Sequence, residues 1–233
     1  MLKVRCSSLG AIMTNPRSKK ETLGQTTKSF VKQYIIERKF GIYKEIHSKY
    51  FDKGNEVEAD AISLCNDVMN LGFIYKNEEK YKNDYITGIP DVNTNDVLLD
   101  IKSSWDLFTF PFFDTEIKNK GYYYQLQGYM WLTGKKEAYL CYCLMNTPQH
   151  LVEDEVRREH WRLNAIDELP EVRKHIESNH NFDHIDDNLR VKSYHIKYDP
   201  ELIEEFKRRI EACREYYNEL DELLTIKEIQ DAK

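Results

Sequence analysis

Residues 88–102 read GIPDVNTNDVLLDIK and carry the most informative charges of the chain. A Gly-Ile-Pro-Asp turn places Asp91 after one apolar run, and a second apolar run is interrupted by Asp100 and followed by Lys102. Because alternate side chains of a strand share a face, Asp100 and Lys102 are predicted to project together, away from Leu99. The stretch therefore brings two carboxylates and an amine into one region of a predicted sheet.

These charges need compensation, because burial beside an apolar strand costs solvation that only a partner or a metal ion restores. Asp91 and Asp100 supply the oxygen ligands that Mg²⁺ prefers, and the backbone carbonyl of Ile101 can add another. Lys102 then lies where it can orient an attacking water molecule or share its proton. The alternative is an ordinary Lys–Asp ion pair in a hairpin.

A helix expected over residues 55–70 supplies a third candidate acid. Its predicted apolar face contains Val57, Ala61, Leu64, Cys65, Val68 and Met69. Glu58 falls inside this apolar arc at 100° per residue. A carboxylate held there favours a metal site or a network with Lys102. The alternative is a flanking side chain that reaches solvent.

The remaining pattern predicts further helices and strands. Helices are expected over residues 28–40, 119–134 and, after a cap at Asp199, from 200 to about 224; strands are expected over residues 73–76, 85–89, 97–102, 138–146 and 191–198. In the helix 119–134, Gln125 and Tyr129 are neighbours that can hydrogen-bond a phosphate or a water molecule. The charged residues 150–190 are expected to be mainly helical, and their histidines fit no standard metal spacing.

Two further segments leave alternatives open. Ser7 or Ser8 is expected to cap a short apolar helix, whose N-terminus beside Arg5 is either an anion site or a plain capped core helix. The aromatic residues 105–113 are expected to form a loop that covers the core, or else an apolar wedge against unpaired bases.

Composition limits the class of protein. A chain of 233 residues can bury one substantial core, and no apolar run approaches the length that spans a bilayer. The N-terminus lacks the apolar core of a signal peptide, so a cytoplasmic location is expected. Five cysteines without paired spacing fit free thiols, and no iron–sulfur cluster is expected.

Charge is segregated along the chain. Residues 1–40 hold nine Lys or Arg and two Glu, a balance of +7, which leaves −13 for the remainder of a chain whose net charge is −6. Positive charge on one face suits a phosphate backbone, and an acidic remainder limits non-specific binding. The alternative is a basic arm that is merely solvated.

A helical Glu, then Asp, then Asp-x-Lys, then Gln-x-x-x-Tyr, in this order, resemble the motifs of the PD-(D/E)xK nuclease superfamily. The chain is more closely similar to the lambda-exonuclease or YqaJ-type phage recombination nucleases of its RecB-like branch. The matching pieces are SSLG at 7–10, KGNEVEADAI at 53–62, GIPD at 88–91, DIKSS at 100–104 and YQLQGYMWL at 124–132.

The resemblance implies a restriction-endonuclease-like α/β fold, a central mixed sheet flanked by helices. It implies one nuclease domain over residues 1–233, with basic N-terminal helices (1–50), a catalytic core (54–146), a charged helical insertion (150–190) and a C-terminal strand and helix (191–233). It assigns Glu58, Asp91, Asp100 and the Ile101 carbonyl to a Mg²⁺ or Mn²⁺ centre, Lys102 to catalysis, and Gln125, Tyr129, Arg5 and Ser8 to contacts with DNA or water.

The resemblance also implies 5′-to-3′ exonuclease activity on linear double-stranded DNA in phage-type recombination. Such an enzyme would act in the cytoplasm of a bacterial or phage-infected cell, supply a single-strand annealing protein and assemble as a trimer. Two departures from the family pattern are Asp100, where Glu is frequent, and Arg5, which stands closer to the serines than the family's phosphate-binding arginine does. The rival hypotheses are an endonuclease with the same core and an inactive DNA-binding or inhibitory module, although no motif acid or lysine is missing.

Overall fold

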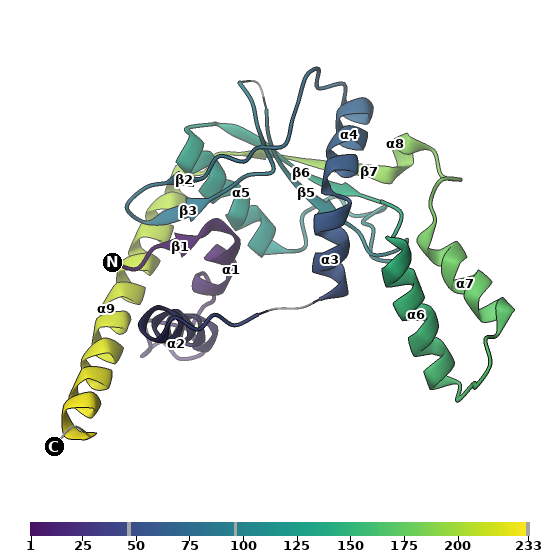
Figure 1. Ribbon diagram of the computed structural model, residues 1–233. Coiled ribbons are helices and arrows are strands. Elements are labelled where there is room, and N and C mark those ends of the chain that lie inside the picture. Colours follow the sequence, from purple (N-terminus) through teal and green to yellow (C-terminus); the bar gives the residue numbers. More distant parts are fainter. Residues whose placement is uncertain (46–47, 96, 232–233) are drawn as a thin grey trace.

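The computed structural model describes residues 1–45, 48–95 and 97–231, with side chains described to residue 225. Its centre is a four-stranded sheet in the order β4-β5-β6-β7, formed by Val92–Asn93, Leu98–Ser103, Glu137–Cys143 and Val191–Lys197. β5 and β6 are parallel, whereas β4 and β7 run antiparallel to their neighbours. Helix α5 (Lys120–Thr133) makes the crossover that the parallel pair requires (Figure 1).

A smaller sheet lies beside the N-terminus. Its order is β1-β3-β2, formed by Val4–Arg5, Ile86–Gly88 and Tyr81–Lys82. β1 pairs with β3 in parallel, and β2 pairs with β3 antiparallel. Because β3 leads into the turn that carries Asp91, this sheet fixes the approach to the motif described above.

The two faces of the central sheet bury different cores. On one face, Ala61 and Cys65 of α4 (Glu58–Met69) pack in the same cluster as Leu99 and Ile101. On the other face, Leu98 joins a cluster built from α5 and from the long helix α9 (Pro200–Asp231). Since side chains alternate along β5, Asp100 and Lys102 lie on the α5 side.

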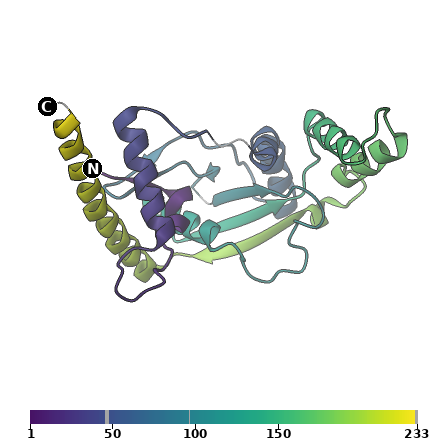
Figure 2. The ribbon, with the colours of Figure 1, turned by 90° about the horizontal axis from the view of Figure 1, so that it is seen from below.

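The remaining helices lie at the two ends of the molecule. The N-terminal end holds the 3₁₀ turn η1 (Cys6–Ser8), α1 (Leu9–Ile12) and α2 (Gln25–Phe40), and α2 packs along α9. The other end holds α6 (Gln149–Arg162), α7 (Pro170–His180) and α8 (Asp187–Arg190), whereas α3 (Lys49–Glu56) stands in line with α4 nearer the middle. Figure 2 shows α2 and α9 at one end of the sheet and the α6–α7 hairpin at the other.

Several expected elements are confirmed. The predicted strands 97–102, 138–146 and 191–198 correspond to β5, β6 and β7, and the predicted helix 119–134 corresponds to α5. Asp199 caps α9, because its side chain accepts a hydrogen bond from Leu202 N at 3.1 Å and Pro200 follows it as the first helical residue. Residues 150–190 are mainly helical, as α6 and α7.

Other expectations are wrong. The single helix expected over residues 55–70 is divided, because Val57 (φ −96°, ψ 7°) ends α3 and starts α4. Residues 73–76 form no strand, and Phe73 is 87% exposed. Ser8 makes no capping hydrogen bond with its side chain, since the chain enters α1 through a 3₁₀ turn.

The central mixed sheet with helices on both faces confirms the expected restriction-endonuclease-like α/β fold. Within the described residues, no helix has the length and apolarity that crossing a membrane requires.

Candidate active site

A cleft of about 780 Å³ opens beside the carboxyl end of β5. Its lining residues come from η1, α3, α4, β5 and α5, and they include Glu58, Asp91, Ile101, Lys102 and Gln125. Asp100 lies directly behind this lining and is fully buried. The fold therefore brings together residues that are far apart in the sequence.

Asp100 and Lys102 share a face of β5, as the alternation predicts. The Lys102 Nζ atom lies 2.6 Å from Asp100 Oδ2, and 5.1 Å from the centre of the Tyr122 ring. Burial lowers the pKa of Lys102, but the neighbouring Asp100 and Asp91 carboxylates outweigh burial and raise it. Lys102 is therefore held protonated at the rim of the cleft.

Asp91 is attached to the same strand through the backbone. Its Oδ2 atom accepts a hydrogen bond from the Ile101 amide at 2.6 Å. Burial, followed by the negative charge of Asp100, raises the pKa of the Asp91 carboxyl to about 7. Burial also raises the pKa of Asp100, against the opposing effect of Lys102. The two carboxyls are thus close enough to disfavour each other's ionised form.

Glu58 faces this pair from the first turn of α4, where it is 22% exposed. Its Oε2 atom pairs with Lys76 Nζ at 2.5 Å. The expectation that Glu58 is buried in the apolar arc of a longer helix is wrong, because the helix begins at Glu58 itself. The expected network with Lys102 is replaced by the ion pair with Lys76.

Gln125 links Asp100 to helix α5. Its Nε2 atom donates to Asp100 Oδ1 at 3.1 Å and to the Tyr129 hydroxyl at 2.8 Å. Gln125 lines the cleft, whereas Tyr129 is 4% exposed and lies behind Gln125. The structure therefore gives Tyr129 a contact with Gln125, and its expected contact with DNA or water stays a prediction.

The N-terminal candidates lie less close to the acids. Ser7 lines the cleft, but neither Ser8 nor Arg5 does. Arg5 is exposed at the end of β1. The roles of Arg5 and Ser8 in binding a terminal phosphate therefore stay predictions.

Sequence reasoning missed two lysines of this region. Lys76 lies in the stretch that was expected to be a strand, and no motif marks it. Lys53 is the residue before Gly54 in the matched motif and is 1% exposed. A lysine that follows Asp52 on a short helix has no pattern that predicts burial.

The donor set fits a hard divalent cation. Asp100 Oδ2 is buried and pairs with the Lys102 ammonium at 2.6 Å. Asp91 and Asp100 together offer carboxylate oxygens, and burial with the charge of Asp100 raises the pKa of Asp91, a cost that a cation would offset. In the part of the chain that the structure describes, however, no three His, Cys, Asp or Glu side chains already form a metal-binding group. Glu58, the third candidate acid, is paired with Lys76.

A mixed sheet that carries Asp91 and the Asp100-x-Lys102 pair, with a helical Glu58 across a cleft, defines the PD-(D/E)xK class. Comparisons with known proteins place the chain within this class. It is 32% identical to a phage-related exonuclease from Haemophilus somnus 129PT, with a TM-score of 0.79 and 96% of each chain covered. The chain therefore belongs to the lambda-exonuclease and YqaJ-type family of phage recombination nucleases.

A second solved structure supports the fold alone. The alkaline exonuclease LHK-Exo from Laribacter hongkongensis is 17% identical, with a TM-score of 0.65 and coverage of 98% of this chain and 94% of that chain. The same protein has also been solved in complex with dAMP. No family model matches the chain, and no curated protein matches it.

Proposed function

We propose that this protein is a divalent-metal-dependent exonuclease that hydrolyses DNA phosphodiester bonds. The observation that carries the proposal is the contact of Lys102 with the buried Asp100 carboxylate, beside Asp91 and inside a cleft of about 780 Å³. The exonuclease from Haemophilus somnus, which is similar over 96% of its length, supports the reaction class. Mg²⁺ or Mn²⁺ is the expected ion because all candidate ligands are oxygen atoms.

The side chains present have distinct roles in this proposal. The ion would be held by Asp91, Asp100, Glu58 and the Ile101 carbonyl. When bound, it would lower the pKa of a water molecule and offset negative charge on the phosphate. Lys102 donates hydrogen bonds and holds a water molecule in line with the scissile phosphorus. Gln125 fixes Asp100 through Oδ1 and leaves Oδ2 facing Lys102.

The proposed substrate is linear double-stranded DNA, degraded from the 5′ end. The first forty residues carry a net charge of +7, and Ser7 brings this segment to the cleft wall. Positive charge near the cleft attracts the phosphate backbone. Family membership further supports a role in phage-type recombination in the cytoplasm of a bacterial or phage-infected cell, with a homotrimer and a single-strand annealing partner.

The test compares linear duplex with covalently closed circular duplex, each with Mg²⁺ and with EDTA. We expect loss of the linear duplex from its 5′ labelled end with Mg²⁺, and no digestion with EDTA. Cutting of the closed circle would replace the exonuclease proposal with the endonuclease rival. If the linear DNA stays intact with both Mg²⁺ and Mn²⁺, the remaining hypothesis is the inactive DNA-binding or inhibitory module.

A further inference from the structure

A buried lysine stands outside the candidate site. Lys53, on α3, is 1% exposed, and its Nζ atom donates to the backbone carbonyl of Trp105 at 2.9 Å. The Trp105 and Phe182 rings lie 5.6 and 5.4 Å from the same atom. Among the residues that the structure describes, no carboxylate forms an ion pair with Lys53. Burial of an amine without a carboxylate is costly, so this arrangement calls for a reason.

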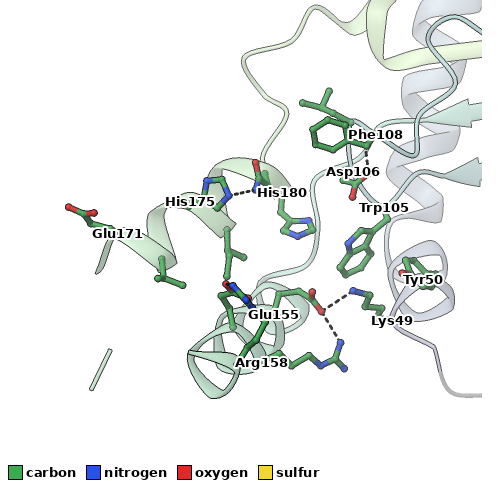
Figure 3. Close-up of a pocket in the computed structure, with 16 residues that line it drawn as sticks. Lys49, Tyr50, Trp105, Asp106, Phe108, Glu155, Arg158, Glu171, His175 and His180 are labelled. Carbon is green, nitrogen blue, oxygen red and sulfur yellow. Dashed lines mark hydrogen bonds and ion pairs between the residues drawn. The ribbon is translucent and has the colours of Figure 1, made fainter. Parts of the chain in front are cut away.

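Trp105, whose carbonyl accepts the Lys53 hydrogen bond, separates two cavities. Trp105 lines the candidate active-site cleft and also a second cavity of about 770 Å³ between α3, α6 and α7. Figure 3 shows Trp105 between Lys49 and Tyr50 on one side and His180 on the other. The Trp105 ring centre lies 5.4 Å from that of Tyr50 and 4.9 Å from that of His180, and 4.4 Å from Lys49 Nζ. Contacts on several sides thus hold the Trp105 ring in one orientation.

The Lys53 hydrogen bond joins the two segments that carry the candidate metal ligands. α3 continues through Val57 into α4, whose first residue is Glu58. Trp105 follows the end of β5, three residues after Lys102. A shift of about 1 Å between reacting groups can cost up to roughly 100-fold in rate. The distance between Glu58 and Lys102 therefore depends on how firmly α3 is attached to the segment after β5.

We propose that Lys53 is a positioning residue that fastens Trp105 to α3 and thereby sets the placement of Glu58 relative to Asp100 and Lys102. The inference rests on the proposed nuclease function and extends it to a residue that touches neither the acids nor Lys102.

The charged surroundings of Lys53 make the attachment sensitive to pH. Burial lowers the pKa of Lys53 to about 7, against a smaller opposing effect of Asp106 in the turn after Trp105. Burial and Lys53 both lower the pKa of His180, while Glu155 of α6 raises it and Lys49 of α3 lowers it. A charged amine donates a stronger hydrogen bond than a neutral one. Loss of the Lys53 proton near neutral pH therefore weakens the hydrogen bond from Lys53 to the Trp105 carbonyl.

The first test follows the fluorescence of Trp105 in metal-free protein. Replacing Trp131 and Trp161 by Phe leaves Trp105 as the remaining tryptophan of three. In a His180→Gln background, which removes the imidazole beside Trp105, we expect a transition in its emission near pH 7 that Lys53→Met abolishes and Lys49→Met preserves. Lys49→Met is the matched control, because Lys49 contacts the Trp105 ring but makes no hydrogen bond to its carbonyl. Persistence of the transition in Lys53→Met would overturn the assignment.

The second test measures metal binding and catalysis separately. We expect Lys53→Met to weaken Mn²⁺ binding by calorimetry at least 3-fold and to lower kcat at least 10-fold, with KM for DNA changed less than 2-fold and with an unfolding midpoint no lower than that of the wild type. Lys49→Met should keep the wild-type affinity for Mn²⁺. Wild-type Mn²⁺ affinity and kcat in Lys53→Met would refute the positioning role. Because fluorescence and Mn²⁺ binding need no hydrolysis, both still decide the role of Lys53 if the wild-type protein proves inactive on DNA.

Discussion

Asp91 and Asp100 place two carboxyls in a region where burial makes each negative charge expensive. Burial raises the pKa of both groups, and Lys102 compensates only part of the cost. Two neighbouring acids that share one ammonium away from solvent are poor for stability, and such arrangements are concentrated at functional sites. A divalent cation bound between these acids would offset this cost.

Replacing Lys102 tests its chemical role. We expect Lys102→Ala to reduce hydrolysis at least about 100-fold, because a positioned proton donor or acceptor contributes about that much or more. DNA binding measured by fluorescence anisotropy should change less than threefold. Lys192→Ala is the matched control, since Lys192 lies on β7 of the same sheet and outside the cleft lining. Undiminished digestion by Lys102→Ala would show that Lys102 has no part in the reaction.

Lys76 tests how Glu58 becomes available to a metal ion. Lys76 is about half exposed, and a surface ion pair of this kind is worth up to about 1 kcal/mol. Because the ammonium and a divalent ion compete for Glu58, Lys76→Met should tighten Mn²⁺ binding about two- to fivefold in calorimetry. The exposed Lys80, four residues on, provides the control. Weaker binding by Lys76→Met would mean that Lys76 supports the site rather than competes for it.

Lys53 gives a pH dependence of stability with a defined sign. Burial lowers its pKa to about 7 from 10.5, so between these values the unfolded chain binds a proton that the folded chain does not. Stability contributed by this group therefore rises with pH above 7, by up to about 1.4 kcal/mol per pH unit. From pH 7 to 10, denaturant titrations should show wild type gaining about 2–4 kcal/mol relative to Lys53→Met. Parallel pH profiles of the two proteins would contradict the lowered pKa.

Strand β3 and helix α5 approach so closely that a glycine is required between them. A Cβ atom on Gly88 would lie 2.6 Å from the Tyr129 ring and 2.8 Å from Cys6 Sγ. Tyr129 in turn hydrogen-bonds Gln125, which holds Asp100. A change in the packing of β3 against α5 would therefore be passed through Tyr129 and Gln125 to Asp100.

Gly88→Ala should lower the free energy of unfolding by about 1–3 kcal/mol, because the buried ring has to move. The displacement should also reduce DNA hydrolysis through Gln125. Gly54→Ala is the stability control, since a Cβ there meets nothing within 4 Å and helix α3 gains propensity. Equal stability of Gly88→Ala and wild type would show that Tyr129 is free to shift.

The sequence predicted elements best where one pattern dominates. The alternation around Asp100 identified β5 and the face that Lys102 shares with it. The spacing of Gln125 and Tyr129 identified their contact on α5. The break at Val57 was missed, because periodicity continues across it while the backbone turns. The irregular path of residues 73–76 was missed because an aromatic-rich run resembles a strand, although Phe73 is exposed. The pairing of Lys76 with Glu58 was missed for the same reason.

At the scale of the whole molecule, the candidate site is assembled from α4, the turn before β4, β5 and α5. Motif order could predict which residues converge, because it is shared with a family. It could not predict the burial of Lys53, which arises from the packing of α3 against the loop after β5. It also could not predict the meeting of Cys65 with Cys143, whose sulfur atoms lie 3.4 Å apart beneath the sheet.

The position of a bound ion tests the central claim most directly, because every proposed role depends on the acids sharing one cation. The measurement is the anomalous difference density of Mn²⁺ in crystals of the wild-type protein. We expect one strong peak about 2.0–2.5 Å from carboxylate oxygens of Asp91 and Asp100, with Glu58 turned from Lys76 toward the ion. A Mn²⁺ peak elsewhere, or none in this cleft at saturating concentration, would contradict the assignment.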